Sequence, residues 1–291
     1  RPGTSGAAWG DTGVCRASVG RVFPETDPSR RTPGVATLGS MSIPQITVGH
    51  GPHHVYVLHG WFGSADGWGL FPTYLDGEQF TYHFFDNRGY GARMDERGDY
   101  SLDEVAGDVL ALADSEGVQT FSLIGHSMGG AEVLRVLAKA PGRVRKIVGI
   151  TPVGASPTPF DEAGHNLFYG ASENRDMRFG IIDFTTGNRN TATWVNSVVE
   201  HSLSHSTVEG FHGALVAWAT PDFLADIAGS EHEMLVIPGE HDPALGEATV
   251  RQTWEPHFPN CRIEVMPNAG HYPMFETPVQ LATVIERFLA D

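Results

Sequence analysis

The chain has 291 residues, with 35 Asp and Glu against 19 Lys and Arg, and its formal net charge at pH 7 is −16 with histidine neutral. A surface of that sign repels phosphate backbones and anionic membranes, so the composition argues against nucleic-acid or membrane binding. The two cysteines, Cys15 and Cys261, form no Cys-x-x-Cys motif, which argues against a disulfide framework and a thiolate zinc site.

The first part of the chain, up to about residue 40, lacks hydrophobic periodicity and is rich in Gly, Pro, Ser, Thr and Arg. Such a composition cannot bury enough apolar surface to offset the entropy lost on ordering. We therefore predict that residues 1–40 form a disordered or loosely attached tail, with Met41 as a candidate native start. The alternative is an ordered arm that packs on the body or on a neighbouring subunit.

Apolar strands alternate with amphipathic helices from Ile43 to Ile150. In the first predicted helix, Ser101 can cap the first turn, with Glu104 at the capping-box position. This alternation predicts a mostly parallel sheet covered by helices on both faces. The predicted strands are 43–48, 54–58, 80–85, 121–124 and 146–150, and the predicted helices are 101–117 and 131–140.

Between Thr151 and about Asp222 this rhythm is interrupted by prolines, glycines and many aromatic residues. Helical pieces are predicted there at 161–169, 191–205 and 206–218. The regular pattern then resumes with strands 233–237 and 262–266 and a closing amphipathic helix, 277–289. We therefore predict a helical lid over 155–222, inserted into a core formed by 41–154 and 223–291.

A serine motif, Gly125-His-Ser127-Met-Gly129, lies between a predicted strand and a predicted helix. The two glycines let strand and helix approach closely, which exposes the serine hydroxyl at a helix N-terminus. Asp242 and His271 each follow a later strand, and the carboxyl ends of parallel strands converge on one crevice. A serine nucleophile needs an imidazole base that is held by a carboxylate, so we predict Ser127, His271 and Asp242 as catalytic residues.

These motifs, from about Ile43 to the C-terminus, resemble those of the α/β-hydrolase superfamily, in which serine, acid and histidine follow in this order. The resemblance implies an α/β-hydrolase fold, with a mostly parallel sheet flanked by helices and an inserted helical cap. Beside the serine motif, the matching segments are His59-Gly60 (oxyanion loop), Gly239-x-x-Asp242 (acid turn), Gly270-His271 (histidine loop) and Glu276-x-Pro278 (start of the last helix).

The resemblance also implies that the backbone N–H groups of Trp61 and Met128 form the oxyanion hole. The expected reaction is cleavage of a carboxylic ester or lactone through an acyl-enzyme, without a cofactor. The aromatic lid predicts a bulky apolar or aromatic substrate. The side chains expected to contact it are Phe62, Phe160, Phe168, Trp194 and Trp218. For Trp61 and Phe62, packing in the core beneath the lid is the alternative.

Other activities share these motifs. Cofactor-free perhydrolases and carbon–carbon bond hydrolases keep the same triad, and a ligand receptor could retain it while turning over very slowly. A serine at this position excludes haloalkane dehalogenation and epoxide opening, for which the superfamily uses Asp. The expected partner is a small apolar ester or lactone, and a homo-oligomer is possible. Because no apolar run approaches the roughly 18 residues that span a bilayer, we expect a cytoplasmic protein.

Some polar residues near the motifs have structural interpretations. Glu240 is the alternative acid of the triad, but it lies two residues before Asp242. His126 is expected to be a packed neighbour of the nucleophile rather than a second base. Asp86 and Arg88 lie in a turn and are expected to be structural.

Histidines gather at two places in the sequence. His201 and His205 are four residues apart on a predicted helix, and the other group is His50, His53 and His54. A metal site needs a further ligand of suitable type, and the sequence does not indicate one, so no metal is predicted. In the lid, His165 and Glu173 are further candidates for substrate contact.

Overall fold

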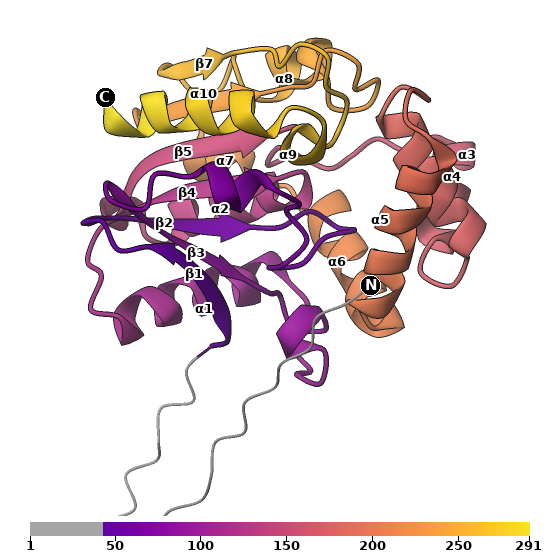
Figure 1. Ribbon diagram of the computed structural model, residues 1–291, viewed down its shortest axis with the longest axis horizontal. Helices are drawn as coiled ribbons and strands as arrows, with labels where there is room; N and C mark the ends of the chain where they lie inside the picture. The colour runs from indigo at the N-terminus through magenta and orange to yellow at the C-terminus, as the bar shows by residue number, and fades with distance from the viewer. Residues whose placement is uncertain (1–42) are drawn as a thin grey trace, which may run out of the picture. The chain divides into compact units, whose positions relative to one another are not determined.

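The computed structural model describes residues 43–291 (Figure 1). The predicted tail, residues 1–40, and the candidate start at Met41 lie outside the described residues. Within residues 43–291, no helix is both long and apolar enough to cross a membrane.

A seven-stranded sheet forms the centre of the described chain, in the order β1-β3-β2-β4-β5-β6-β7. Strand β1 pairs antiparallel with β3, and all other neighbours are parallel. Every residue of β3 and β4 is buried, as expected for strands with both faces covered. The strands are β1 Gln45–Gly49, β2 His53–Leu58, β3 Phe80–Phe85, β4 Phe121–His126, β5 Val144–Ile150, β6 Glu233–Ile237 and β7 Cys261–Ile263.

Helices cover both faces of this sheet. Figure 1 shows α10 on one side of the strands and α1 on the other. The helices outside the 151–222 segment are α1 Leu102–Ser115, α2 Met128–Lys139, α7 Leu224–Ile227, α8 Glu247–Thr253, α9 Pro273–Glu276 and α10 Pro278–Ala290, with 3₁₀ turns η1 Phe71–Tyr74, η2 Gly91–Arg93 and η3 Pro141–Arg143.

The start of α1 differs in detail from the predicted capping box. Ser101 Oγ accepts a hydrogen bond from the Glu104 amide at 3.2 Å, as the cap requires. The Glu104 carboxylate, however, accepts from the amides of Asp99 and Tyr100 at 3.1 and 3.0 Å. It therefore fixes the loop before the helix rather than the cap residue itself.

Four helices lie between β5 and α7, and Figure 1 shows them grouped beside one end of the sheet. Three match predicted pieces, whereas α4 was not predicted. Its inward face carries Arg178, whose guanidinium donates to Ala171 O and Ser172 O at 2.9 and 3.2 Å and stacks 3.7 Å from the Phe211 ring. A charged residue on the buried face hides the apolar period in the sequence. These helices are α3 Glu162–Gly170, α4 Arg175–Thr185, α5 Ala192–Ser204 and α6 Val208–Ala219.

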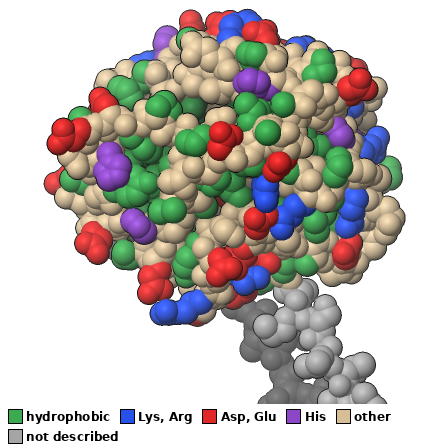
Figure 2. Space-filling model, turned by 180° about the vertical axis from the view of Figure 1, so that it is seen from behind, with side chains coloured by type: hydrophobic (Ala, Val, Ile, Leu, Met, Phe, Trp, Pro, Cys, Tyr) green, Lys and Arg blue, Asp and Glu red, His purple; other side chains and the backbone are tan. Residues whose placement is uncertain are grey.

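Charged groups are spread over the surface. Figure 2 shows one face on which acidic, basic and apolar side chains are interspersed. Arg135 illustrates the pairing, because it contacts Asp103 at 2.9 Å and Asp226 at 3.3 Å. Since carboxylates outnumber basic groups, the net charge stays negative after such pairing.

Candidate active site

The tight turn at Ser127 connects β4 directly to α2. Ser127 has φ 52° and ψ −114°, a backbone conformation that side-chain-bearing residues rarely adopt. A Cβ on Gly125 would lie 2.2 Å from Gly129 O, and one on Gly129 would lie 2.5 Å from Leu58 O. Only glycine permits these approaches, so the strand and the helix hold the serine at the apex of a sharp turn.

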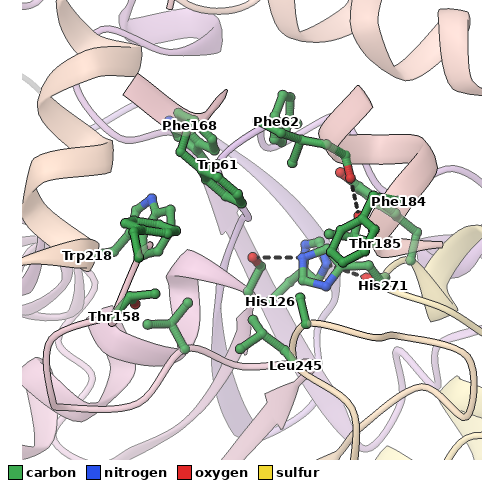
Figure 3. Close-up of a pocket in the computed structure, with 16 residues that line it drawn as sticks. Trp61, Phe62, His126, Thr158, Phe168, Phe184, Thr185, Trp218, Leu245 and His271 are labelled. Atoms are coloured by element: carbon green, nitrogen blue, oxygen red, sulfur yellow. Dashed lines mark hydrogen bonds between the residues drawn. The ribbon is translucent and has the colours of Figure 1, made fainter. Parts of the chain in front are cut away.

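Three side chains form a hydrogen-bonded row at the carboxyl end of the sheet, and Figure 3 shows the middle one, His271, at the edge of a cavity. Ser127 Oγ lies 2.9 Å from His271 Nε2, and His271 Nδ1 lies 2.6 Å from Asp242 Oδ2. A carboxylate can only accept, so Nδ1 carries the proton and Nε2 accepts from the serine hydroxyl. The Asp242 side chain is fully enclosed, and its Oδ1 accepts from the amides of Ala244 and Leu245 at 2.9 and 3.0 Å.

The backbone around His271 is held from three sides. Its carbonyl oxygen lies 2.8 Å from His126 Nε2 and accepts from Thr151 Oγ1 at 3.1 Å, and its amide donates to Thr185 O at 3.2 Å. Burial, with the nearby His271, lowers the pKa of His126 well below its usual value, so this ring is neutral. Because its Nε2 donates to a carbonyl, His126 orients the base and does not accept protons there.

The Gly60–Trp61 peptide is oriented by His59. His59 Nε2 accepts from the Asn87 amide at 3.2 Å, so its Nδ1 is the donor to Gly60 O at 2.9 Å. Gly60 O also accepts from the Gly63 amide at 2.9 Å. In a trans peptide the N–H points opposite to the C=O, so the Trp61 amide faces away from these partners.

Neither predicted oxyanion-hole amide, that of Trp61 or that of Met128, donates to an acceptor within residues 43–291. Met128 is the first residue of α2, where helical amides have no partner one turn earlier. Two unpartnered N–H groups near the serine are the donors that a tetrahedral oxyanion would need.

A cavity of about 180 Å³ opens next to Ser127 and His271. Figure 3 shows Trp61, Phe168 and Trp218 across the cavity from His271. Four of the five side chains predicted to contact substrate line it, and the lining is mostly apolar. The residues that line it are Trp61, Phe62, His126, Ser127, Val153, Thr158, Phe160, Phe168, Ile181, Phe184, Thr185, Trp218, Ala244, Leu245, His271 and Tyr272.

Trp194, the fifth side chain predicted to contact substrate, is not among the residues that line this cavity. Its ring packs edge-on against Tyr272 and Phe275, with centroids 5.5 and 5.9 Å apart. The face of α5 that carries it therefore turns toward the segment after His271 rather than into the cavity. Conversely, Ile181 and Phe184 line the cavity from α4, the helix that the sequence did not reveal.

The alternative and structural residues lie outside the row. Glu240 Oε2 accepts from the Asn268 amide at 2.8 Å, so its carboxylate binds the backbone of the loop before His271 instead of the His271 ring. Asp86 accepts from the amides of Ala65 and Ala92 at 2.7 and 2.9 Å and so fixes the loop after β2. Arg88 pairs with Asp108 and Glu104, both at 2.9 Å. His165 and Glu173 are not among the cavity-lining residues.

The three histidines near the first strands do not come together. His50 pairs with Glu78 at 3.4 Å, His53 Nε2 lies 2.8 Å from Ser122 Oγ, and His54 Nδ1 lies 2.9 Å from His83 Nε2. Each ring has a different neighbour, so these three form no common site.

Glu132, in the second turn of α2, is a buried carboxyl outside the row. Its Oε1 accepts from Asn87 Nδ2 at 2.6 Å, whereas its Oε2 has no partner within residues 43–291. Burial raises the pKa of Glu132 to about 8, and the bond from Asn87 opposes this rise.

The raised pKa of Glu132 predicts a pH-dependent stability. A carboxyl whose pKa is higher in the folded state than in the unfolded chain contributes its full stabilisation at pH values below the unfolded-state pKa. This contribution is lost as the pH rises through the folded-state pKa of about 8. Relative to Glu132→Gln, the free energy of unfolding of wild type should fall between about pH 5 and 8, by up to about 1.4 kcal/mol per pH unit. Urea unfolding at several pH values measures this difference. Parallel profiles of the two proteins would contradict the burial of a titrating carboxyl.

The alpha/beta hydrolase family matches residues 55–284 of this chain. Esterase YbfF from Escherichia coli is 26% identical over 252 residues, which cover 83% of this chain and 95% of that protein. The dihydrolipoyllysine-residue acetyltransferase component of the acetoin cleaving system from Cupriavidus necator is 22% identical over 250 residues. That match covers 83% of this chain but only 64% of the relative. Bromoperoxidase from Bacillus anthracis has a similar structure, with a TM-score of 0.76, 20% identity and coverage of 85% and 95%.

Proposed function

This chain belongs to the alpha/beta hydrolase family, which confirms the fold expected from its motifs, and we propose that it cleaves carboxylic esters through an acyl-enzyme. The observation that carries the proposal is the row from Ser127 through His271 to Asp242, which opens onto an apolar cavity. An esterase among the relatives supports the same class of reaction.

The proposed reaction begins at Ser127 Oγ, which attacks the ester carbonyl while His271 Nε2 takes its proton. The negative charge that forms on the carbonyl oxygen is stabilised by the amides of Trp61 and Met128. The imidazolium, held by Asp242, then gives its proton to the departing alkoxide. In the second half of the reaction a water molecule gives a proton to His271 and attacks the acyl-enzyme. The acid is released, and Ser127 regains its proton from His271.

The proposed substrate is a bulky apolar or aromatic ester, or a lactone of that kind. The support is the lining of the cavity, which is mostly apolar. Large aromatic surfaces come from Trp61, Phe62, Phe168 and Trp218. Such a pocket gains most of its affinity from apolar contact.

A panel of p-nitrophenyl esters with acetyl, octanoyl and phenylacetyl groups, together with an aromatic lactone, tests this function. We expect turnover of the esters, with the highest kcat/KM for the bulky groups. The same protein is assayed for peracid formation from acetate and peroxide and for cleavage of a vinylogous 1,5-diketone. Turnover in either of those assays without ester or lactone hydrolysis would contradict the proposal.

Phe184 offers a test of the substrate pocket with little structural cost. It lines the cavity but is 47% exposed, so its truncation removes contact with substrate more than contact with the core. We expect Phe184→Ala to lower kcat/KM for bulky esters about 10-fold, because a lost apolar contact is worth about 1–3 kcal/mol, and to change acetate hydrolysis much less.

Leu203→Ala is the matched control for Phe184→Ala. Leu203 is also an exposed apolar side chain on a helix between β5 and β6, at 39% exposure, and it is not a cavity-lining residue. Equal losses in the two variants, or equal losses for bulky and acetyl esters, would show that this cavity does not bind the substrate.

A further inference from the structure

Outside the catalytic row, three side chains of types that commonly bind metal ions lie close together beside the loop after β2. Asp66 comes from that loop, and His201 and His205 come from the last turn and the end of α5. One ligand atom from each residue lies within 4.8 Å of the others. The sequence shows the two histidines four residues apart, whereas only the fold brings the carboxylate to them.

The distances fit one ion shared by three ligands. Asp66 Oδ2 lies 3.5 Å from His205 Nε2, and Asp66 Oδ1 lies 3.9 Å from His201 Nε2. Ligands placed about 2.0–2.1 Å from a tetrahedral zinc ion are about 3.4 Å from one another. The two imidazole rings are nearly parallel, with centroids 4.0 Å apart, so both can face the carboxylate. Only small movements separate this arrangement from coordination.

The hydrogen bond at His205 Nδ1 leaves Nε2 of the same ring facing the carboxylate. Its Nδ1 lies 3.0 Å from His201 O, and because a carbonyl can only accept, Nδ1 donates this bond. Nε2, 3.5 Å from Asp66 Oδ2, is then the ring atom available to an ion. A ring nitrogen that donates to a backbone carbonyl is also the usual second-shell bond of a metal-binding histidine.

The space around the group is compatible with an ion. Gly67 has no side chain, and a Cβ there would lie 2.7 Å from His201 Nε2. Asp66, Gly67 and His201 also border a second cavity, of about 260 Å³, through which an ion could enter. Ser64 Oγ lies 2.6 Å from His201 Nε2 and 2.5 Å from Asp66 Oδ1, so an ion must displace one of these hydrogen bonds.

We propose that Asp66, His201 and His205 bind one divalent transition-metal ion of the zinc type, with solvent or the Ser64 hydroxyl completing the coordination. Two imidazoles and one carboxylate favour Zn²⁺ and its neighbours over Mg²⁺ and Ca²⁺, which prefer all-oxygen sites. The ion would link helix α5 to the loop after β2, which also carries Trp61. The site does not depend on the proposed ester hydrolysis.

Calorimetric titration of the untagged, chelator-treated full chain with Zn²⁺ tests the site. We expect one equivalent to bind, with no comparable heat from Mg²⁺ or Ca²⁺. His201→Ala and His205→Ala should each weaken Zn²⁺ binding by about 100-fold or more, because each removes a direct ligand, whereas loss of a second-shell partner costs about 10–100-fold. His212→Ala, which removes an exposed histidine on α6, should bind Zn²⁺ like wild type.

Asp66→Asn provides a variant that does not threaten the fold, because the Asp66 side chain is 54% exposed. It should weaken Zn²⁺ binding even if a histidine variant unfolds. Thermal unfolding of each metal-free variant establishes which ones are folded. Absence of stoichiometric binding by wild type, or binding that Asp66→Asn leaves unchanged, would overturn the proposal. The group would then be a polar cluster of Ser64, Asp66, His201 and His205 held by its own hydrogen bonds and ion pairs.

Discussion

Ser127→Ala is expected to lower kcat/KM for a phenylacetyl ester by about 10⁴-fold or more. The variant removes the hydroxyl oxygen that would accept the acyl group in the proposed reaction, and residual turnover would come from bound water aided by the oxyanion hole. His271 Nε2, which lies 2.9 Å from Ser127 Oγ, would no longer have a hydroxyl from which to take a proton. Steady-state kinetics on the preferred ester measures the effect, and thermal unfolding checks that the variant is folded.

The stability of Ser127→Ala should remain close to that of wild type. Alanine and serine are similarly strained at φ 52°, so the substitution does not relieve the turn. Ser115→Ala, which removes an exposed hydroxyl near the end of α1, is the control and should keep full activity. If Ser127→Ala retains ester hydrolysis within about 10-fold of wild type, Ser127 is not the nucleophile.

The sheet and the catalytic row could be predicted because their signals are local. A strand that ends in a glycine-flanked turn can be recognised within nine residues, and strands with apolar residues on both faces indicate a sheet that is buried on both sides. The rule that parallel strands converge at their carboxyl ends then relates Ser127, Asp242 and His271 across 144 residues of chain. The structure brings all three together as that rule requires.

Features that depend on the orientation of helices could not be predicted in this way. Trp194 and Trp218 look equivalent in the sequence, but α5 turns one toward Tyr272 and α6 turns the other into the cavity. Helix α4 was missed because Arg178 occupies its buried face, where its guanidinium donates to the carbonyl oxygens of Ala171 and Ser172.

The partner of the two helical histidines illustrates the same limit. His201 and His205 are separated from Asp66 by more than a hundred residues, and nothing near Asp66 in the sequence marks it as a ligand. The proximity arises because the backbone at 205–207 is tied to the turn after β3. His205 O accepts from the Gly91 amide at 2.9 Å, and Tyr90 forms a bridge with Ser206. Such contacts between distant segments appear only once the chain is folded.

Asp242→Asn is expected to lower kcat by about 10⁴-fold while leaving the fold intact, because the two side chains have nearly the same shape. Asp242 Oδ1 accepts from two amides, so the oxygen of the asparagine must stay in that position. Its NH₂ group then takes the place of Oδ2, 2.6 Å from His271 Nδ1. A donor there forces Nδ1 to accept and moves the imidazole proton to Nε2, which can no longer take the proton of Ser127.

Glu240→Gln is the matched control for Asp242→Asn, because it removes the same charge two residues away in the same turn. Glu240 accepts a hydrogen bond from the Asn268 amide, and the glutamine oxygen can keep this bond. The activity of Glu240→Gln should therefore stay within about 3-fold of wild type, because substitutions of exposed groups usually have small energetic effects. Kinetics of the two variants with the same ester separate the candidate acids. A large loss in Glu240→Gln together with a small one in Asp242→Asn would assign the acid to Glu240 and require a shifted turn. Large losses in both would point instead to damage of the turn, which thermal unfolding would reveal.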